Sequence, residues 1–293
     1  MESIVFEILP PPATWGSEKT THYCKQIANM LRSQNILSVS IPEVVEEHRT
    51  GNRQEIFHPK IDVQHFATLL KHHHHALIPI PYKISVRMPL QEFGEWIEQI
   101  YEKGTRHLVI VGGEAHSIDY PGYTVIEAIA FIKKHYPEMK VGAITIFTRP
   151  GETERIIEKM KAGADFFFSQ IIFEAANMKV VLLNLSRQCK KAGVAMPKIF
   201  LSLAIASKIK DIEFMHWLGV EFPSAVLAYL TEEQEKNVEF RSIEVMDMLL
   251  DEIFHFIHKE KIDVGFNIEH VMYSNLLLSH KLLKKIKQRI AEE

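Results

Sequence analysis

The sequence SIVFEILPPP, residues 3–12, places one glutamate inside an apolar run that stops on three prolines. The run from Ser3 to Leu9 is short and rich in β-branched and aromatic residues, which predicts a β-strand. Because proline has no backbone N–H to donate to a sheet, the prolines end that strand. Glu7 is therefore expected near the carboxyl end of a strand.

Similar short apolar runs alternate along the chain with longer segments of helical period, such as Gln91 to Lys103 and Thr153 to Ala162. This alternation predicts a parallel sheet whose strands are joined by crossover helices. The expected strands are Ile4 to Leu9, Ile36 to Ile41, Ala76 to Val86, His107 to Gly113, Lys140 to Ile146, Asp165 to Ile172, Pro197 to Leu203 and Ile262 to Ile268.

Eight strand–helix units in 293 residues favour a closed (β/α)₈ TIM barrel, for which about 250 residues is typical. A doubly wound open sheet is the alternative, but Gly112-Gly113-Glu114 lacks the third glycine and the helix start of a dinucleotide-binding fingerprint. The stretch from Thr231 to Lys261 is longer than one crossover. We therefore expect an α/β TIM barrel with an extra helix before the last strand, as a single domain over residues 1–293.

The composition narrows the classes of partner. With 46% hydrophobic residues, 24% charged residues and a net charge of -3, the chain is expected to be globular. It contains no basic block of the kind that binds nucleic acid. The basic stretch from Lys281 to Arg289 is typical of the solvated face of an amphipathic helix, and a contact with an anionic surface is the less favoured alternative.

The cysteines and the apolar runs of the sequence also indicate in which cellular compartment the protein is expected. Cys24 and Cys189 are the two cysteines, and they fall on separate predicted helices, so no disulfide is required. No apolar run approaches the roughly 20 residues that span a bilayer, and residues 1–9 lack the pattern of a signal peptide. We expect a cytoplasmic protein that does not enter a membrane.

The active site of a TIM barrel lies at the carboxyl ends of its strands, where polar side chains converge on one mouth. Two carboxylates and an amide in such a mouth could bind and protonate a nitrogen-rich ring that carries a carbonyl group. The polar residues at the expected strand ends are Glu7, Ser40, Arg87, Glu114, Thr145, Gln170, Ser202 and Asn267 or Glu269.

Four consecutive histidines, His72 to His75, invite comparison with a metal site. In a strand or loop such neighbours alternate sides, so they cannot all ligate one ion, and no paired cysteine or acidic motif accompanies them. We interpret the run as structural or exposed and expect no metal.

Several segments, in this order and spacing, resemble the methylenetetrahydrofolate reductase family, and the resemblance extends over nearly the whole chain. They match the family's first strand with its catalytic acid, its second strand, its fourth strand with a carboxylate after glycine, and its sixth-strand segment. The segments are Phe6-Glu7 with the prolines that follow, Ser38 to Ser40, Gly104 to Val109 with Gly113-Glu114, and Lys161 to Phe173.

The resemblance implies a TIM barrel that binds FAD and a reduced folate. In that chemistry NAD(P)H reduces the flavin, and the flavin then passes a hydride to the methylene carbon of 5,10-methylenetetrahydrofolate, which becomes 5-methyltetrahydrofolate. The chain would then be a flavoprotein oxidoreductase of one-carbon metabolism. Whether NADH or NADPH is the donor stays open.

The resemblance also implies roles for individual residues. Glu7 would be the general acid that protonates the N10 side of the folate, and its pKa would need to be raised by a dry setting. Glu114 would place a negative charge near the cationic intermediate. Gln170 would orient the pterin by hydrogen bonds, and Phe173 would line the same substrate site.

The flavin contacts implied by the resemblance are Ser40, Gly113, Thr145 and Arg149. Around them the chain departs from the family, because the tyrosine and histidine expected after the fifth strand are absent and Gly112 stands where the family often has arginine. Two alternatives therefore remain: a folate-binding or methyl-transfer barrel without flavin redox, and a subunit that needs an electron-donating partner protein. A homo-oligomer is also compatible with the sequence.

Overall fold

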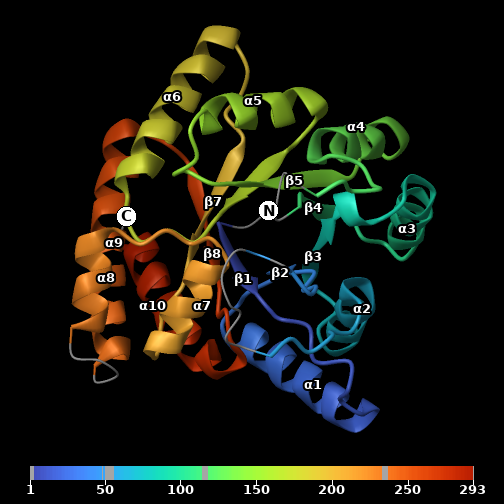
Figure 1. The fold of residues 1–293 in the computed structure, drawn as a ribbon, viewed down its shortest axis with the longest axis horizontal. Helices are drawn as coiled ribbons and strands as arrows, with labels where there is room; N and C mark the ends of the chain where they lie inside the picture. The colour runs from blue at the N-terminus through green and yellow to red at the C-terminus, as the bar shows by residue number, and fades with distance from the viewer. Residues whose placement is uncertain (1–2, 48, 50–55, 114–117, 233–236, 293) are drawn as a thin grey trace.

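The computed structural model describes residues 3–47, 49, 56–113, 118–232 and 237–292. Within them the strands pair in parallel, each with its neighbours in chain order, and the last strand pairs with the first to close a barrel (Figure 1). The predicted TIM barrel is therefore confirmed. The strands are β1 (Ile4–Glu7), β2 (Ser38–Ile41), β3 (Ile78–Ile84), β4 (His107–Val111), β5 (Lys140–Thr145), β6 (Phe166–Ser169), β7 (Lys198–Leu203) and β8 (Val264–Ile268).

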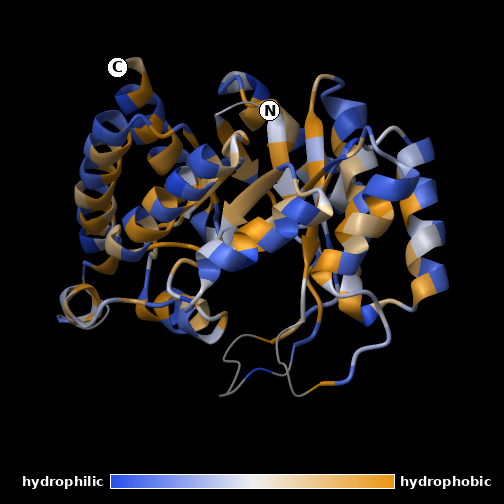
Figure 2. Cartoon of the chain, turned by 90° about the horizontal axis from the view of Figure 1, so that it is seen from above, coloured by the Kyte–Doolittle hydropathy of each residue, from blue (hydrophilic) through white to orange (hydrophobic). Residues whose placement is uncertain are grey.

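Helices surround the barrel, and hydrophilic and hydrophobic residues alternate along them (Figure 2), as expected where one face packs against the strands. Three helices, α7 to α9, lie between β7 and β8, so the extra helix before the last strand is confirmed. The α-helices are α1 (Ser17–Ser33), α2 (Val63–His73), α3 (Leu90–Glu102), α4 (Val125–His135), α5 (Glu152–Ala162), α6 (Ala176–Ala192), α7 (Ile209–Trp217), α8 (Ser224–Thr231), α9 (Val238–Glu260) and α10 (Leu276–Ala291), and the 3₁₀ turns are η1 (Ser85–Arg87) and η2 (Tyr273–Asn275).

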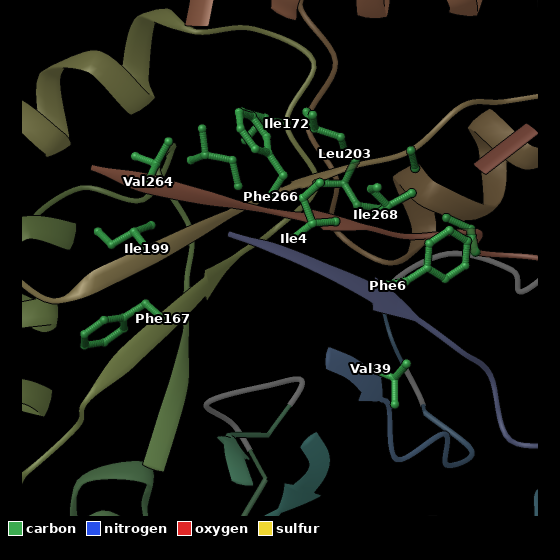
Figure 3. Close-up of a cluster of buried hydrophobic side chains, with 14 of the residues drawn as sticks. Ile4, Phe6, Val39, Phe167, Ile172, Ile199, Leu203, Val264, Phe266 and Ile268 are labelled. Atoms are coloured by element: carbon green, nitrogen blue, oxygen red, sulfur yellow. The ribbon is translucent and has the colours of Figure 1, made fainter. Parts of the chain in front are cut away.

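Alternate residues of each strand face opposite sides of the barrel wall. Ile4, Phe6 and Ile268 belong to the large core between the strands and the surrounding helices (Figure 3). Val5, between Ile4 and Phe6, belongs to a second cluster that fills the barrel interior. Glu7 is two residues beyond Val5 and therefore shares its interior side.

Aromatic rings fill the interior below the mouth. Phe166, Phe168 and Phe200 pack there, with the Phe168 and Phe200 ring centroids 5.0 Å apart. Gly142 and Gly265 make room for them, because a Cβ would stand 2.3 Å from the Phe166 ring at the first and 2.4 Å from the Phe200 ring at the second. The barrel is thus a packed core rather than a pore, and ligand chemistry is confined to its upper end.

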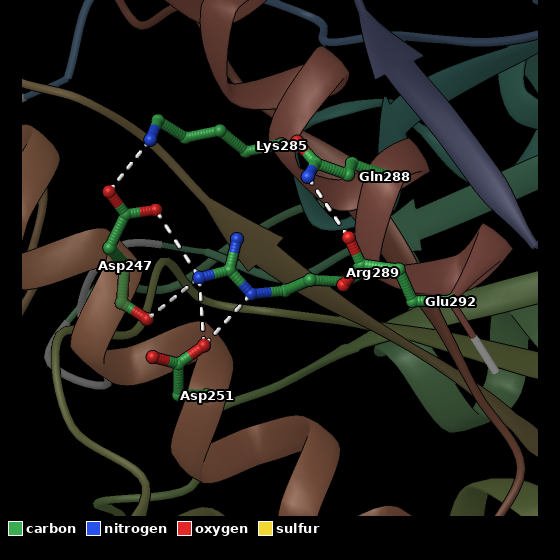
Figure 4. Close-up of polar contacts among 6 residues, drawn as sticks. All are labelled: Asp247, Asp251, Lys285, Gln288, Arg289 and Glu292. Carbon is green, nitrogen blue, oxygen red and sulfur yellow. Dashed lines mark hydrogen bonds and ion pairs between the residues drawn. The ribbon is translucent and has the colours of Figure 1, made fainter.

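The long α9 is tied to the C-terminal α10 by charged contacts (Figure 4). The Lys285 ammonium lies 2.7 Å from an Asp247 oxygen, and the Arg289 guanidinium lies 2.8 Å from an Asp251 oxygen. Lys285 and Arg289 of α10 therefore face acidic partners on α9, which agrees with a helix face rather than with a contact to an anionic surface.

The histidine run lies at the end of α2. Its first two members are helical rather than in a strand or loop, and the His72 and His73 rings meet edge to face. Among the described residues, no three His, Cys, Asp or Glu side chains are grouped so that they could hold a metal ion.

None of the described helices has the length and hydropathy needed to cross a membrane. Cys24 and Cys189 are free and buried.

Candidate functional site

The three prolines after β1 form an anchored turn. The Leu9 N–H donates to Nε2 of His270 at 3.3 Å, and the Tyr23 hydroxyl donates to the Leu9 carbonyl at 3.1 Å. The Tyr273 hydroxyl donates to the Pro10 carbonyl at 2.5 Å. Because side chains of α1, of the segment after β8 and of η2 hold the β1–α1 turn, the end of β1 and Glu7 within it are fixed in place.

Glu7 is the acid at that strand end. It is 6% exposed, and no hydrogen bond to its carboxyl group occurs among the described residues. Burial raises the pKa of Glu7 well above its ordinary value, and the nearby Glu269 charge raises it further. Glu7 is thus a buried carboxyl group whose protonated form is favoured by its surroundings, which is the property that the family resemblance requires of a general acid.

A hydrogen-bonded network lies beside Glu7. The Ser40 hydroxyl donates to Oδ1 of Asn267 at 3.0 Å. The Asn267 amide nitrogen in turn donates to the Ser202 hydroxyl and to a Glu269 carboxylate oxygen, each at 3.0 Å. Ser40, Ser202 and Asn267 are fully buried. The network therefore joins β2, β7 and β8 in one polar layer above the aromatic rings.

Two further ionisable groups belong to this layer. Glu269 is half-buried, and burial raises its pKa to about 7, although its hydrogen bonds with Ser202 and Asn267 act in the opposite direction. The Tyr82 hydroxyl is hydrogen-bonded with Ser40, and its pKa is raised by burial and by the charges of Glu7 and Glu269. The Tyr82 ring lies 5.9 Å from the Phe168 ring, at the top of the aromatic floor.

His270 follows Glu269 and serves the turn rather than proton transfer. Burial lowers its pKa to about 4, so the imidazole is neutral at neutral pH. Its Nε2 accepts the hydrogen bond from Leu9, so Nδ1 carries the proton that it donates to the Met272 carbonyl at 3.0 Å. This tautomer follows from the two partners.

The predicted substrate contacts lie at a separate pocket. Gln170 directly follows β6, its amide nitrogen donates to the Leu218 carbonyl at 3.4 Å, and its amide oxygen accepts from the Ile171 N–H at 3.0 Å. Phe173 is buried against Phe222, with ring centroids 4.3 Å apart. Gln170 and Phe173 line one pocket, together with Asn177 and other residues. Around the barrel, β7 and β8 separate β6 from β1.

The four expected flavin contacts do not form one cradle. The Ser40 hydroxyl is engaged in the network, and the Thr145 hydroxyl donates to a Glu152 carboxylate oxygen at 2.9 Å. The Tyr120 ring fills the space over Gly113, where a Cβ would stand 2.4 Å from it. Arg149 is exposed. The residues as they stand do not fit a flavin at the predicted positions.

Thr145 differs from the other strand-end residues in its direction. Ile144 packs against the interior cluster, so Thr145, one residue further along β5, faces the helices. There Glu152, in the first turn of α5, accepts bonds from the Thr145 hydroxyl and, at 3.1 Å, from the Ile146 N–H. This arrangement fixes the loop after β5 rather than presenting a hydroxyl to the mouth.

Of the remaining residues predicted at strand ends, one lies outside the described residues and one holds two segments together. Glu114, predicted as a second catalytic carboxylate, lies outside the described residues. Arg87 lies in η1 and donates to the Glu46 carbonyl at 3.0 Å, so it ties the segment after β2 to the end of β3. Tyr82 and His270 were not among the predicted site residues. The alternation of Ile80 and Tyr82 along β3 is the signal that would have placed the Tyr82 ring inside the barrel.

A comparison with family models agrees with the fold. The family model described as methylenetetrahydrofolate reductase matches residues 63–262. A search among curated proteins found no match.

Several solved structures share the fold. An uncharacterized protein from Clostridium thermocellum, which binds two copies of 5-methyl-5,6,7,8-tetrahydrofolic acid, is similar with a TM-score of 0.80 and 22% identity over 97% of this chain and 95% of that one. A riboflavin lyase with modified FMN and riboflavin has a TM-score of 0.56 and 9% identity over 97% of this chain and 91% of its own. A long-chain alkane monooxygenase has a TM-score of 0.55 and 9% identity over 98% of this chain and 91% of its own. At these identities the likeness concerns the fold.

Proposed function

The chain belongs to the methylenetetrahydrofolate reductase family, and from this premise we propose that it binds a reduced folate at the carboxyl end of its barrel. The reaction we propose is the reduction of 5,10-methylenetetrahydrofolate to 5-methyltetrahydrofolate, with Glu7 as the proton donor and an external two-electron donor, NAD(P)H or an electron-donating partner protein, as the source of the hydride. A similar barrel from Clostridium thermocellum binds 5-methyltetrahydrofolate, which supports the choice of ligand.

The observation that carries the proposal is the state of Glu7. The methylene bridge of the folate becomes an electrophile when its bond to N10 opens, and this opening requires a proton on the N10 side. A carboxyl group that is 6% exposed, without hydrogen bonds among the described residues and with a pKa raised well above its ordinary value, is suited to give that proton near neutral pH.

Gln170 and Phe173 supply the second part of the proposed site. The Gln170 amide can present one donor and one acceptor to the edge of a pterin ring if it exchanges its 3.4 Å bond to the Leu218 carbonyl for the ligand. Phe173 would pack beside the ring from the same pocket. The pterin would then extend from this pocket toward Glu7, across the ends of β7 and β8.

The source of the hydride is a separate question from the folate site. In the family FAD supplies the hydride, but the four flavin contacts predicted from the sequence do not form a cradle here, so we assign no step to a flavin. Folate binding or methyl transfer without flavin redox is the second candidate. It is favoured by one observation, namely that the Ser40 and Thr145 hydroxyls are already bonded within the protein.

Calorimetric titration with 5-methyltetrahydrofolate tests the proposed ligand. We expect saturable binding by the natural protein and by Lys285→Ala, a control on α10 that leaves the barrel mouth intact. Absence of heat and of any protection against thermal unfolding, at folate concentrations up to about 1 mM, would reject a folate site.

A visible spectrum taken before and after addition of excess FAD separates the two candidate functions. Retention of FAD after removal of the free cofactor, followed by anaerobic bleaching with NADH or NADPH, would support the reductase and identify the donor. If folate binds and FAD does not, the protein is a folate-binding barrel, or one that receives electrons from a partner protein.

A further inference from the structure

The pairing of β1 with β8 aligns two acidic side chains at the barrel mouth. Val5 pairs with Asn267 and Phe6 with Ile268, so the next residues, Glu7 and Glu269, follow side by side at the ends of the two strands. Neighbouring strands lie about 4.8 Å apart. Val5 and Asn267 both face the barrel interior, and alternation turns Glu7 and Glu269 to the same side.

The two carboxyl groups have unequal surroundings. Glu269 accepts a hydrogen bond from the Asn267 amide at 3.0 Å and is hydrogen-bonded with Ser202, whereas Glu7 has no such partner among the described residues. Hydrogen bonds to an ionised carboxylate stabilise the charged form. Glu269 is therefore the better site for the negative charge, and Glu7 is the better site for the proton.

The neighbouring ionisable groups do not neutralise this charge. The pKa of the Tyr82 hydroxyl, from β3, is raised, and the pKa of His270 is lowered to about 4, so both are neutral at neutral pH. Lys83, the residue after Tyr82, pairs with Glu43 at 2.6 Å. Ser40 and Ser202, from β2 and β7, do not titrate. Two negative charges close together in this setting are unfavourable, so one proton is retained.

We propose that Glu7 and Glu269 form a pair that holds one proton, with Glu7 as the protonated member and Glu269 as the charged residue that keeps it protonated. Glu269 is thus a positioning residue for the proton. When Glu7 gives its proton to a ligand nitrogen, the ligand gains one positive charge and meets two carboxylates. This assignment rests on the proposed function for its ligand, but the state of the pair in the free protein does not.

Infrared titration of the ligand-free protein tests the pair directly. Glu7→Gln and Glu269→Gln each remove one carboxyl group, so the difference spectra identify which group is protonated at each pH. In Glu269→Gln we expect the midpoint of the Glu7 titration to fall by about 1 pH unit or more, because a like charge is gone. Glu174→Gln, which changes a carboxylate after β6 that accepts from Asn177, is the matched control and is expected to leave the midpoint unchanged.

An unchanged Glu7 midpoint in Glu269→Gln would overturn the pair. If that variant does not fold, Ser202→Ala replaces it. Loss of the hydrogen bond between Ser202 and Glu269 is expected to move the proton from Glu7 toward Glu269. If the proton is shared between Glu7 and Glu269 as in the natural protein, the result would equally contradict the proposal. Because no folate is present, failure of folate binding does not affect this result.

The pH dependence of turnover adds a readout that a structural role would not change. Activity that needs protonated Glu7 falls as pH rises through its pKa, and in Glu269→Gln this fall is expected about 1 pH unit or more lower. A uniform loss at every pH would indicate that Glu269 only supports the fold, which would contradict the proposal.

Discussion

Ser40 and Asn267 are joined by a hydrogen bond of 3.0 Å, although β1 lies between their two strands. The bond crosses the barrel interior at the level where β1 ends in Glu7. Together with the bonds from Asn267 to Ser202 and Glu269, it makes a continuous polar layer from β2 to β7. A buried layer of this kind is stable only when its donors and acceptors are paired with one another, and this requirement makes the site rigid.

Removal of the central amide is expected to weaken the fold. Asn267→Ala removes the acceptor of the Ser40 hydroxyl and the amide donor to Ser202 and Glu269, so the free energy of unfolding should fall by about 1–3 kcal/mol. Urea denaturation measures the change. Asn177→Ala, which alters an exposed amide bonded to Glu174, is the control and should cost less than about 0.5 kcal/mol. Equal losses in the two variants would contradict the importance of the network.

Replacement of the proposed acid should separate chemistry from folding. Glu7→Gln keeps the shape of the protonated side chain, so the melting temperature should not fall at neutral pH. Turnover of 5,10-methylenetetrahydrofolate should fall roughly 10²- to 10⁴-fold, the range expected when a positioned acid is lost. If a flavin is retained, its reduction by nicotinamide should be nearly unchanged. An equal loss in both half-reactions would reject the acid role.

The amide of Gln170 provides a test of where the pterin lies. Gln170→Ala removes both polar atoms that would meet the ring, so the dissociation constant for 5-methyltetrahydrofolate should rise by roughly tenfold, as for one or two lost hydrogen bonds. Calorimetry measures the constant directly. The control variant is Asn177→Ala, which changes another amide that lines the same pocket but lies away from the strand end. An unaltered affinity in Gln170→Ala would remove Gln170 from the site.

His270 should make stability depend on pH. Its pKa falls from an ordinary value of 6.5 to about 4 on folding, so the folded state binds fewer protons than the unfolded state between these values. Stability is therefore complete above about pH 6.5 and is lost progressively as the pH falls toward 4. In His270→Gln this part of the decline should be absent. Thermal unfolding from pH 4 to 7 measures it, and identical slopes in the two proteins would contradict a neutral buried His270.

Sequence pattern was sufficient for the barrel but not for the direction of every side chain. The β-branched runs predicted each strand, because strand composition and crossover helices leave few other folds. Glu7, Ser40, Ser202 and Asn267 were expected at strand ends and meet in one layer. Thr145 was expected there as well, but its position on β5 turns it toward α5, and only the alternation set by Ile144 reveals this.

Partners within the site were harder to predict than positions. Asn267 and Glu269 were alternatives at the end of β8, and the structure uses both, since they lie two residues apart on one face. The engagement of Gln170 with Leu218 depends on the turn after α7, which lies far along the chain. Contacts between distant segments of this kind do not follow from local periodicity.

The most direct test of the folate site is a crystal structure of the protein grown with 5-methyltetrahydrofolate. We predict a pterin at the carboxyl ends of the strands, with a folate nitrogen within hydrogen-bond distance of Glu7 and the Gln170 amide turned to the ring. Folate bound elsewhere would contradict the proposal, for example in the groove at the opposite end of the barrel that Phe254 and Lys261 line. So would a mouth that stays free of ligand at saturating folate.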